Sequence, residues 1–340
     1  MIAIKKHVKI MKPANMKGDK PMKKNFEMIC RMSQAELKDH VVRELLKTHK
    51  DIYSGDGYVF AQGTFPVLLV AHLDTVHKNL PQVILYDAHK KTMSSPQGIG
   101  GDDRCGVFMI FEIIKRFNCS VLFCEDEEIG TVGARKFTET DLAQTLSFNY
   151  AIEFDRKGKN DAVFYDCDND EFEEFITKEY YATAYGSFSD ISVVAPFLKC
   201  AAVNLSCGYY NAHTTSEYVV VTEMIASINA ACNILERTTE NDKFEYVECN
   251  YYNNRWGRSY GGWGSVNSWY ETISSDVVDE DFELYYLFEF VDEYGNANWW
   301  EVEAVSEAEA VGYFCMAHPN VPYSNIRDIM VDDVYGYKSK

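Results

Sequence analysis

Apolar and polar residues follow two different periodic patterns between residues 33 and 237. Short apolar runs, of which residues 66–71 form the longest, have the length of buried strands. Other segments place apolar residues at helical spacing, and the first of them begins with a capping box made by Ser33 and Glu36. Its apolar stripe consists of Leu37, Val41, Leu45 and Leu46. Strands that alternate with helices predict a mainly parallel sheet covered on both faces.

The individual elements follow from these patterns. Strands are expected at residues 58–62, 67–71, 83–86, 92–94, 120–124, 150–154, 162–165 and 201–205. The third and fourth of these flank a polar turn and are expected to pair as a hairpin. Helices are expected at residues 107–117, 134–137, 172–180 and 222–237.

The pattern divides the chain into four regions. Residues 1–24 carry eight lysines against one acid without periodicity, so we expect a basic flexible tail ahead of a core at residues 25–240. Residues 241–278 are rich in Tyr, Gly, Ser and Asn and are expected to form a linker. Residues 279–340 are expected to form an acidic ββαβ module. Its predicted elements are strands at 283–291, 297–305 and 326–331 and a helix capped by Ser306.

Composition narrows the class of protein. A formal net charge of −19 argues against nucleic acid as a partner, because phosphate binding needs a basic surface. No apolar run approaches the ~18 residues of a membrane span, and the N-terminus lacks the features of a secretory signal. The ten cysteines are scattered singly, several beside apolar runs, as is typical of reduced buried thiols. We therefore expect a cytoplasmic protein without a disulfide framework or a cysteine-type zinc site.

Acidic and histidine residues gather at five junctions between predicted strands or turns and the loops or helices that follow them. The junctions hold His72 with Asp74, Asp102 with Asp103, Glu125 to Glu128, Asp155, and His213. Carboxyl ends of parallel strands meet at one edge of a sheet, where ligands bind. Taken singly, each group is more typical of a helix cap or a solvated surface. Together they predict bound cations, because clustered anions repel one another unless cations lie between them.

In this order and spacing, the five groups resemble those of the co-catalytic metallo-exopeptidases, a di-zinc clan that includes peptidase T, the aminoacylases and the zinc aminopeptidases. The resemblance covers residues 33–237 and is carried by the segments 72–74, 101–106, 126–130, 155 and 211–217. It implies a three-layer αβα zinc-exopeptidase-like fold with a mainly parallel mixed sheet, to which the small C-terminal ββαβ module, an α+β unit, is added.

The resemblance further implies two divalent metal ions. Imidazole and carboxylate ligands without thiolate suit Zn²⁺, and Mn²⁺ or Co²⁺ would also fit. Asp103 would bridge the two metals, because it is the second aspartate and stands immediately before Arg104. The remaining ligands would be His72 and Asp155 for one metal, and Glu128 and His213 for the other. Glu153 shares a face of the strand with Asp155, which is preferred because it ends the strand.

Catalytic and substrate-binding roles are implied in the same way. Glu127 would be the general base, moving a proton from a metal-bridging water to the leaving amine. Asp74 would hold the far nitrogen of His72 and fix its tautomer. Asp190, after Ser189, lies in a segment that helps to shape the substrate pocket in these enzymes. A hydroxyl from Tyr209 or Tyr210 is expected to reach the oxyanion.

Two intervals in the sequence limit the transfer from the family. Asp103 follows His72 by 31 positions and His213 follows Asp155 by 58, which leaves no space for the lid domain of peptidase T-like enzymes. A compact, lidless core is therefore expected. Arg104 and Arg156 are expected to form local ion pairs with the acidic rim, and His77 and His89 to be exposed in loops.

The predicted function is a di-metal hydrolase of amide bonds, an aminopeptidase or dipeptidase acting on short peptides. The first alternative is a deacylase of N-acyl amino acids, and the second is a non-catalytic interaction protein that reuses the fold. The C-terminal module carries no catalytic signature, but Trp299 and Trp300 are expected to be exposed there. This predicts a protein partner or self-association through that module, or a cover for the active-site mouth.

Overall fold

The computed structural model describes residues 19–248, except 179 and 187, and parts of a C-terminal unit. In that unit it describes residues 285–292, 295–303, 310, 314, 317–318, 321, 325–332 and 338–339. The chain divides into two compact units, residues 1–263 and residues 264–340. Among the described residues, no helix combines the length and the apolar character needed to cross a lipid bilayer.

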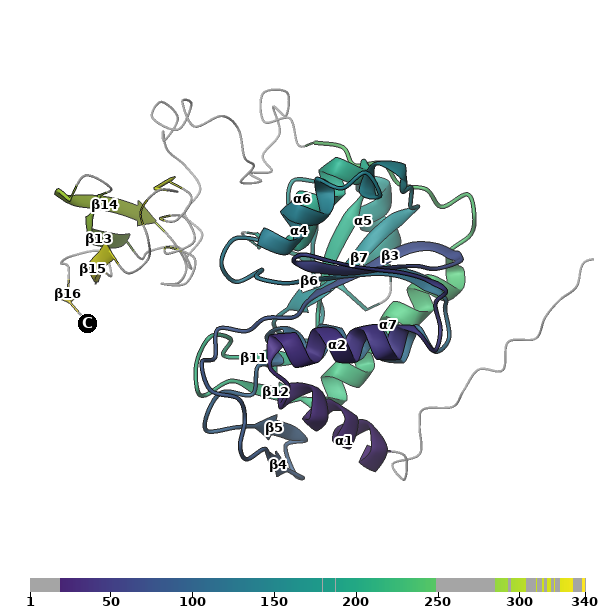
Figure 1. Ribbon diagram of the computed structural model, residues 1–340, viewed down its shortest axis with the longest axis horizontal. Coiled ribbons are helices and arrows are strands. Elements are labelled where there is room, and N and C mark those ends of the chain that lie inside the picture. The colour runs from purple at the N-terminus through teal and green to yellow at the C-terminus, as the bar shows by residue number, and fades with distance from the viewer. Residues whose placement is uncertain are drawn as a thin grey trace, which may run out of the picture. The chain divides into compact units, whose positions relative to one another are not determined.

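An eight-stranded mixed sheet forms the centre of the first unit (Figure 1). Its strands, in spatial order, are β1 (Asp51–Gly55), β2 (Tyr58–Gln62), β6 (Cys119–Cys124), β3 (Phe65–His72), β7 (Tyr150–Arg156), β10 (Ala202–Ser206), β8 (Asp161–Val163) and β9 (Ala182–Ala184). The four central strands, β6, β3, β7 and β10, run parallel to one another. Because they are parallel, the carboxyl ends of these four strands lie at one edge of the sheet. Strands β1, β2 and β8 pair antiparallel with their inner neighbours.

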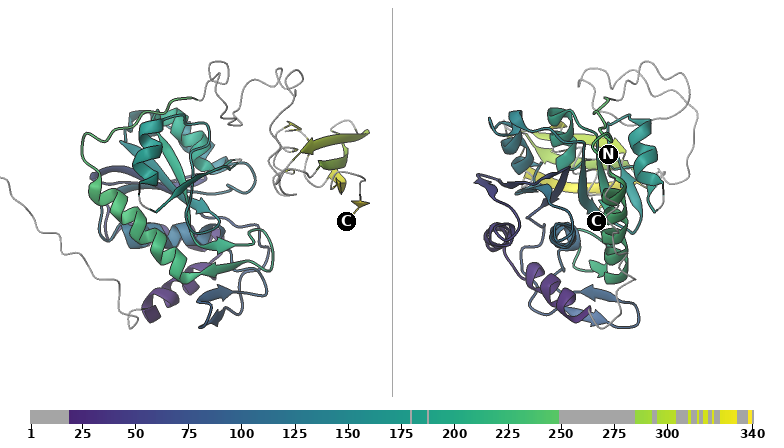
Figure 2. Two further views of the ribbon diagram at one scale, coloured as in Figure 1. Left: turned by 180° about the vertical axis from the view of Figure 1, so that it is seen from behind. Right: turned by 90° about the vertical axis from the view of Figure 1, so that its right-hand side faces the viewer.

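Helices cover both faces of this sheet and create two hydrophobic cores. Along β3, Val67, Leu69 and Ala71 lie in one core, whereas Leu68 and Val70 lie in the other, as the alternation of a strand requires. The first core is closed by α1 (Asp19–Cys30), α2 (Gln34–Leu45), α3 (Gly101–Ile113) and α7 (Val221–Arg237), and the second by α4 (Val132–Thr138) and α6 (Asp190–Leu198). Figures 1 and 2 show α4 and α6 on one side of the sheet and α1, α2 and α7 on the other. The expected three-layer αβα fold is confirmed.

The remaining elements of this unit are short. They are the helix α5 (Asp170–Thr177), the 3₁₀ turn η2 (Ala143–Thr145), and a four-stranded sheet in the order β11 (Tyr209–Tyr210), β12 (Tyr218–Val220), β5 (Thr92–Ser94) and β4 (Leu85–Asp87). Strands β4 and β5 form the predicted hairpin. Because β12 pairs with β5, the loop between β11 and β12 is held beside the segment that leads into α3.

Several observed element bounds differ from those expected from the sequence. Helix α1 begins at Asp19, inside the expected tail, because Phe26, Ile29 and Cys30 are buried on one of its faces. Three of the eight lysines, Lys20, Lys23 and Lys24, therefore lie on this helix. Phe26 packs edge-on against Phe108 of α3, with ring centroids 5.5 Å apart. Residues 1–18 lie outside the described residues.

The core also extends beyond the predicted end at residue 240. The backbone N–H of Ala201 donates to the carbonyl of Phe244, and the N–H of Phe244 donates to the carbonyl of Asn149. The Phe244 ring packs on Tyr150 and Phe172. Conversely, Leu46, expected in the buried stripe of α2, caps that helix and is 65% exposed.

The C-terminal unit is a sheet in the order β14 (Ala297–Glu303), β13 (Tyr285–Val291), β15 (Ile326–Asp332) and β16 (Lys338–Ser339). The predicted hairpin and closing strand are present, and β13 lies between its two partners. Phe314 packs against Phe288 and Phe290 in a small core. Trp299 is 56% exposed as predicted, but Trp300 packs on Phe314, because neighbours on a strand face opposite sides. The predicted helix cap at Ser306 lies outside the described residues.

Candidate metal centre

The parallel strands bring four of the five predicted junctions to one edge of the sheet. His72 is the last residue of β3, Asp155 lies near the end of β7, and Glu128 follows β6. The pair Asp102 and Asp103 opens α3, which packs against β3 and β7. The fifth junction, His213, reaches the same place from the loop between β11 and β12.

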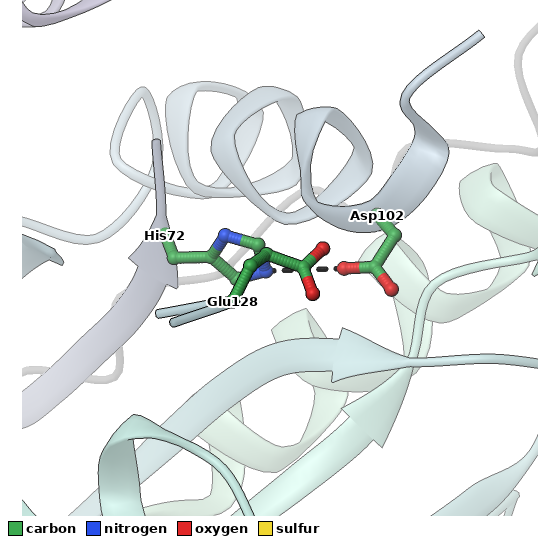
Figure 3. Close-up of side chains that lie close together, drawn as sticks. All are labelled: His72, Asp102 and Glu128. Carbon is green, nitrogen blue, oxygen red and sulfur yellow. Dashed lines mark hydrogen bonds and ion pairs between the residues drawn. The ribbon is translucent and has the colours of Figure 1, made fainter. Parts of the chain in front are cut away.

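His72 is the most enclosed member of the group. Its side chain has no exposed surface, because the residue ends a strand that is buried on both faces. The imidazole Nδ1 lies 3.1 Å from Asp74 Oδ1, which is the contact expected from the sequence. Its Nε2 lies 3.0 Å from Asp102 Oδ1 and 3.5 Å from Asp155 Oδ1. Figure 3 shows His72, Asp102 and Glu128 converging on one point.

Asp102 occupies the position between the two histidines. Its Oδ1 faces His72 Nε2, and its Oδ2 lies 3.2 Å from His213 Nε2. Asp103, to which the sequence assigns the bridge, instead accepts backbone hydrogen bonds from His72 at 3.2 Å and Gly106 at 2.8 Å. The two side chains diverge because neither residue has helical backbone angles, although both lie in the first turn of α3.

His213 and Glu128 form the second half of the group. His213 Nε2 lies 3.0 Å from Glu128 Oε2, so this imidazole contacts both Glu128 and Asp102. The arrangement therefore has two halves, one around His72 with Asp155 and one around His213 with Glu128, and Asp102 is shared by both.

Asp74 positions more than the imidazole of His72. Its Oδ1 and Oδ2 each accept a hydrogen bond of 3.0 Å, from the backbone N–H groups of Glu127 and Glu128 respectively. The same acidic loop is held from outside by α2, since Lys38 pairs with Glu125 and Gln34 Nε2 lies 3.0 Å from Asp126 Oδ1. One carboxylate thus fixes both the histidine and the loop that carries the predicted base.

The electrostatics of the group reflect many acids in a small buried space. Burial raises the pKa of Glu127 well above its ordinary value, and burial together with Asp102 raises the pKa of Asp155 to about 7. Hydrogen bonds to Asp102 and Glu128 raise the pKa of His213 to about 11. Burial opposes ionisation of Asp102, but the two imidazoles lower its pKa overall. Protons and imidazolium charges therefore balance the acids when no other cation does.

The donor set suits divalent metal ions. Ligand atoms of His72, Asp102 and Glu128 lie within 4.8 Å of one another, as do those of His72, Asp103 and Asp155. Glu128 Oε1 is buried and has no hydrogen-bond partner among the described residues. Imidazole nitrogens and carboxylate oxygens without thiolate are ligands for Zn²⁺, Mn²⁺ or Co²⁺. The eight described cysteines are unpaired and buried, and these two ligand groups contain none of them.

The residues predicted to bind substrate are placed differently from one another. The buried Tyr209 directs its hydroxyl to Asp155 Oδ1 at 3.2 Å, whereas Tyr210 donates to Glu223 Oε2 of α7 at 2.6 Å. Asp190 is fully buried and so does not line an accessible pocket. Apart from the thiol of Cys124, its carboxylate has no hydrogen-bond partner among the described residues, and burial raises its pKa to about 7. Glu153 is also buried and bonds to Ser189.

Two expectations for charged residues near the group need correction. Arg104 forms no ion pair with a described residue; its terminal nitrogens donate to the backbone carbonyls of Leu73 and Met32 within the core. His77, expected to be exposed, has a side chain only 8% exposed and bonds to Glu217. Glu217 has no role predicted from the sequence, although it stands four residues after His213. His89 is exposed, and Arg156 pairs locally with Asp161, as predicted.

Comparison with known proteins gives structural neighbours only. No family model and no curated protein matches the sequence. An aminopeptidase PepT from Bacillus cereus superposes with a TM-score of 0.53 at 14% identity, over 64% of this chain and 98% of that one. A tripeptidase from Staphylococcus aureus gives 0.53 at 10% identity, also over 64% and 98%. Aminopeptidase APDkam598 from Desulfurococcus kamchatkensis gives 0.50 at 13% identity, over 65% and 96%. The chain therefore shares the fold of these peptidases.

Proposed function

We propose that this chain is a di-metal hydrolase of amide bonds that acts as an aminopeptidase or dipeptidase on short peptides. One observation carries the proposal: the carboxylate of Asp102 presents one oxygen to each of two imidazoles, at 3.0 and 3.2 Å. A second carboxylate, Asp155 or Glu128, lies beside each imidazole. The shared fold of an aminopeptidase and a tripeptidase adds support for the substrate class.

The assignment of ligands differs from the sequence prediction at one position. We assign the shared ligand to Asp102, because both oxygens of Asp103 are engaged by backbone N–H groups. His72 and Asp155 would hold one ion, and Glu128 and His213 the other. When bound, the two ions would lower the pKa of the attacking water and polarise the scissile carbonyl.

Glu127 is the proposed general base. Asp74 fixes the backbone of Glu127, and the Glu127 carboxyl lies close enough to His72, Asp155 and Glu128 for their charges to act on its pKa. It would take a proton from the attacking water as the water oxygen bonds to the carbonyl carbon. The same proton would then pass to the leaving amine as the carbon–nitrogen bond breaks. Tyr209 is a better candidate than Tyr210 to orient groups of the metal centre, because its hydroxyl contacts Asp155 whereas that of Tyr210 contacts Glu223.

Metal analysis and a substrate screen test this proposal. Full-length chain, purified with Zn²⁺ present, is expected to hold close to two ions and to hydrolyse aminoacyl-anilides. Hydrolysis of N-acyl amino acids in place of the anilides would identify a deacylase instead. Clearly less than one ion per chain would contradict the enzyme and favour an interaction protein that reuses the fold.

The C-terminal unit remains proposed as a docking surface for a protein partner or for self-association. The exposed Trp299 on β14 supports this. Because residues 241–248 pack on the core, a truncation test of its role should end after residue 248 and not at residue 240. An unchanged substrate profile in that variant would exclude a cover over the active-site mouth.

A further inference from the structure

Glu217 is a fully buried carboxylate that lies outside the proposed ligand set and has three hydrogen-bond donors around it. Its Oε1 accepts the backbone N–H of Asp102 at 3.0 Å. Its Oε2 accepts the backbone N–H of Gly100 at 2.8 Å and lies 2.8 Å from Nε2 of His77. One side chain thus connects the loop after β3, the turn before α3 and the loop after β11.

The glycine-rich turn before α3 is shaped around this pair. A Cβ added to Gly98 would lie 2.2 Å from the ring of His77, and Gly98 has a φ of +85°. A Cβ added to Gly101 would lie 3.2 Å from Glu217 Oε1 and 2.8 Å from Cβ of Tyr209. A side chain at Gly98 would displace the His77 imidazole, and one at Gly101 would press on Tyr209 and crowd the Glu217 carboxylate. Gly98 is therefore required by the close approach of His77, and Gly101 by Tyr209 and Val219, with Glu217 next in distance.

Glu217 also belongs to the loop that carries His213. The backbone N–H of Glu217 bonds to the carbonyl of Thr214 at 3.1 Å, which closes a tight turn directly after His213. This loop consequently holds Asp102 at two points. His213 contacts the carboxylate of Asp102, and Glu217 contacts its backbone.

We propose that the His77–Glu217 pair is a positioning unit that sets the affinity of the centre for divalent metal ions. The inference rests on the proposed function. Glu217 touches no metal ligand atom; it fixes the backbone of Asp102, whose two oxygens serve both halves of the centre. Loss of this hold is expected to weaken metal binding on both sides, since partners that orient a ligand typically contribute 10–100-fold in affinity.

The substitution Glu217→Gln weakens the hold without changing the volume of the side chain. The amide that replaces the carboxylate would have one carbonyl oxygen for the N–H groups of Asp102 and Gly100, and its NH₂ would face one of these donors. Two substitutions of His77 provide a second test. His77→Gln keeps a hydrogen-bond donor for Glu217, whereas His77→Leu does not.

Calorimetric titration of the chelator-treated, full-length chain with Zn²⁺ alone tests the inference. Glu217→Gln is expected to raise the Kd of both sites about 10–100-fold, with an unchanged circular dichroism spectrum. Glu236→Gln, which removes a carboxylate from the exposed pair with Arg116, is the matched control and should keep the original Kd. His77→Leu is expected to raise the Kd, and His77→Gln to restore it.

The outcomes separate the two proposals. A folded Glu217→Gln variant with the original Kd would overturn the positioning role and leave the proposed function intact. If that variant does not fold, equal Kd values for His77→Leu and the unsubstituted chain would overturn the role in its place. An unsubstituted chain that binds no Zn²⁺ would refute the proposed function and, with it, this inference.

Discussion

The two histidines of the centre face the same aspartate but are held in different ways. His72 ends a buried strand, has no exposed surface, and has a carboxylate partner at both ring nitrogens. His213 lies in a loop with a φ of 64°, and its side chain is 38% exposed. The sheet therefore positions the first imidazole, whereas a short loop, anchored by Glu217, positions the second.

The two sides should therefore differ in how strongly they affect the stability of the folded chain. Around His72, Glu153 has one carboxylate oxygen without a partner among the described residues, and the Asp190 carboxylate has only the thiol of Cys124. A buried acid without a partner destabilises the folded chain when it ionises. The His213 side is partly solvated, so changes there should affect metal binding with little effect on folding. The following predictions test that division.

The largest expected effect is a loss of activity that involves the His72 side and the His213 side equally. Glu127→Gln is expected to lower kcat by roughly 10²–10⁴-fold, because the base is lost while neither imidazole is disturbed. Calorimetry should show both metal sites retained. Glu112→Gln, in an exposed pair on α3, is the control for the loss of one carboxylate. Equal turnover in the Glu127 and Glu112 variants would refute the role of Glu127 as base.

Separate substitution of the two adjacent aspartates tests which of them is shared by the two halves of the centre. Asp102→Asn is expected to weaken metal binding on both sides by more than the roughly 100-fold typical of an outer partner. Asp103→Asn should cost less, since Asp103 bonds to backbone N–H groups. The measurement is Zn²⁺ stoichiometry and Kd for each variant. A greater loss in the Asp103 variant would return the bridge to the residue that the sequence predicts.

The two histidines should differ most in stability. In the metal-free chain, His72→Ala is expected to lower the free energy of unfolding by about 3 kcal/mol, because it leaves buried acids without their partner. His213→Ala should cost below about 1 kcal/mol, as is typical of partly exposed pairs. Urea unfolding with chelator present measures both values. Equal losses would show that His213 in its loop contributes as much to stability as His72 at the end of β3.

The pH dependence of stability should arise on the His72 side. Burial raises the pKa of Asp190 to about 7 in the folded chain, so the folded state holds this proton more tightly than the unfolded state. Its contribution to stability is complete below pH ~4 and is lost as the pH rises through about 7. Asp190→Asn should therefore raise the free energy of unfolding by roughly 4 kcal/mol at pH 8, because the asparagine cannot ionise.

The same substitution should give no gain at pH 4, where Asp190 is already protonated. Urea unfolding of the metal-free chain at the two pH values provides the comparison. An identical change at both pH values would mean that ionisation of Asp190 does not govern the effect.

The smallest expected effect concerns the two adjacent tyrosines. Tyr209→Phe removes the hydroxyl that contacts Asp155 and is expected to lower kcat/KM by about 10-fold, a typical cost for one hydrogen bond to a charged group. Tyr210→Phe removes a contact with Glu223 and should have a smaller effect. Steady-state kinetics on an aminoacyl-anilide distinguishes them. A larger loss at Tyr210 would reverse the assignment.

The sequence by itself determined the elements and the chemical types of the site. Strand period and helical period are local properties, so β3, β6, β7 and α7 were predicted close to their observed bounds. Acids and histidines after these strands indicated a cation site, because parallel strands bring their carboxyl ends to one edge. The capping box at Ser33 and Glu36 was equally local and is present.

Only the tertiary structure decided which neighbours touch. Asp102 and Asp103 are adjacent and identical in type, and their different partners depend on backbone angles and on β3, β7 and the His213 loop meeting there. Helix α1 was missed because its burial depends on α3, far along the chain. The pairing of His77 with Glu217 joins residues 140 positions apart. Periodicity records which face of an element is buried, but which distant residue lies opposite that face follows only when the whole chain has folded.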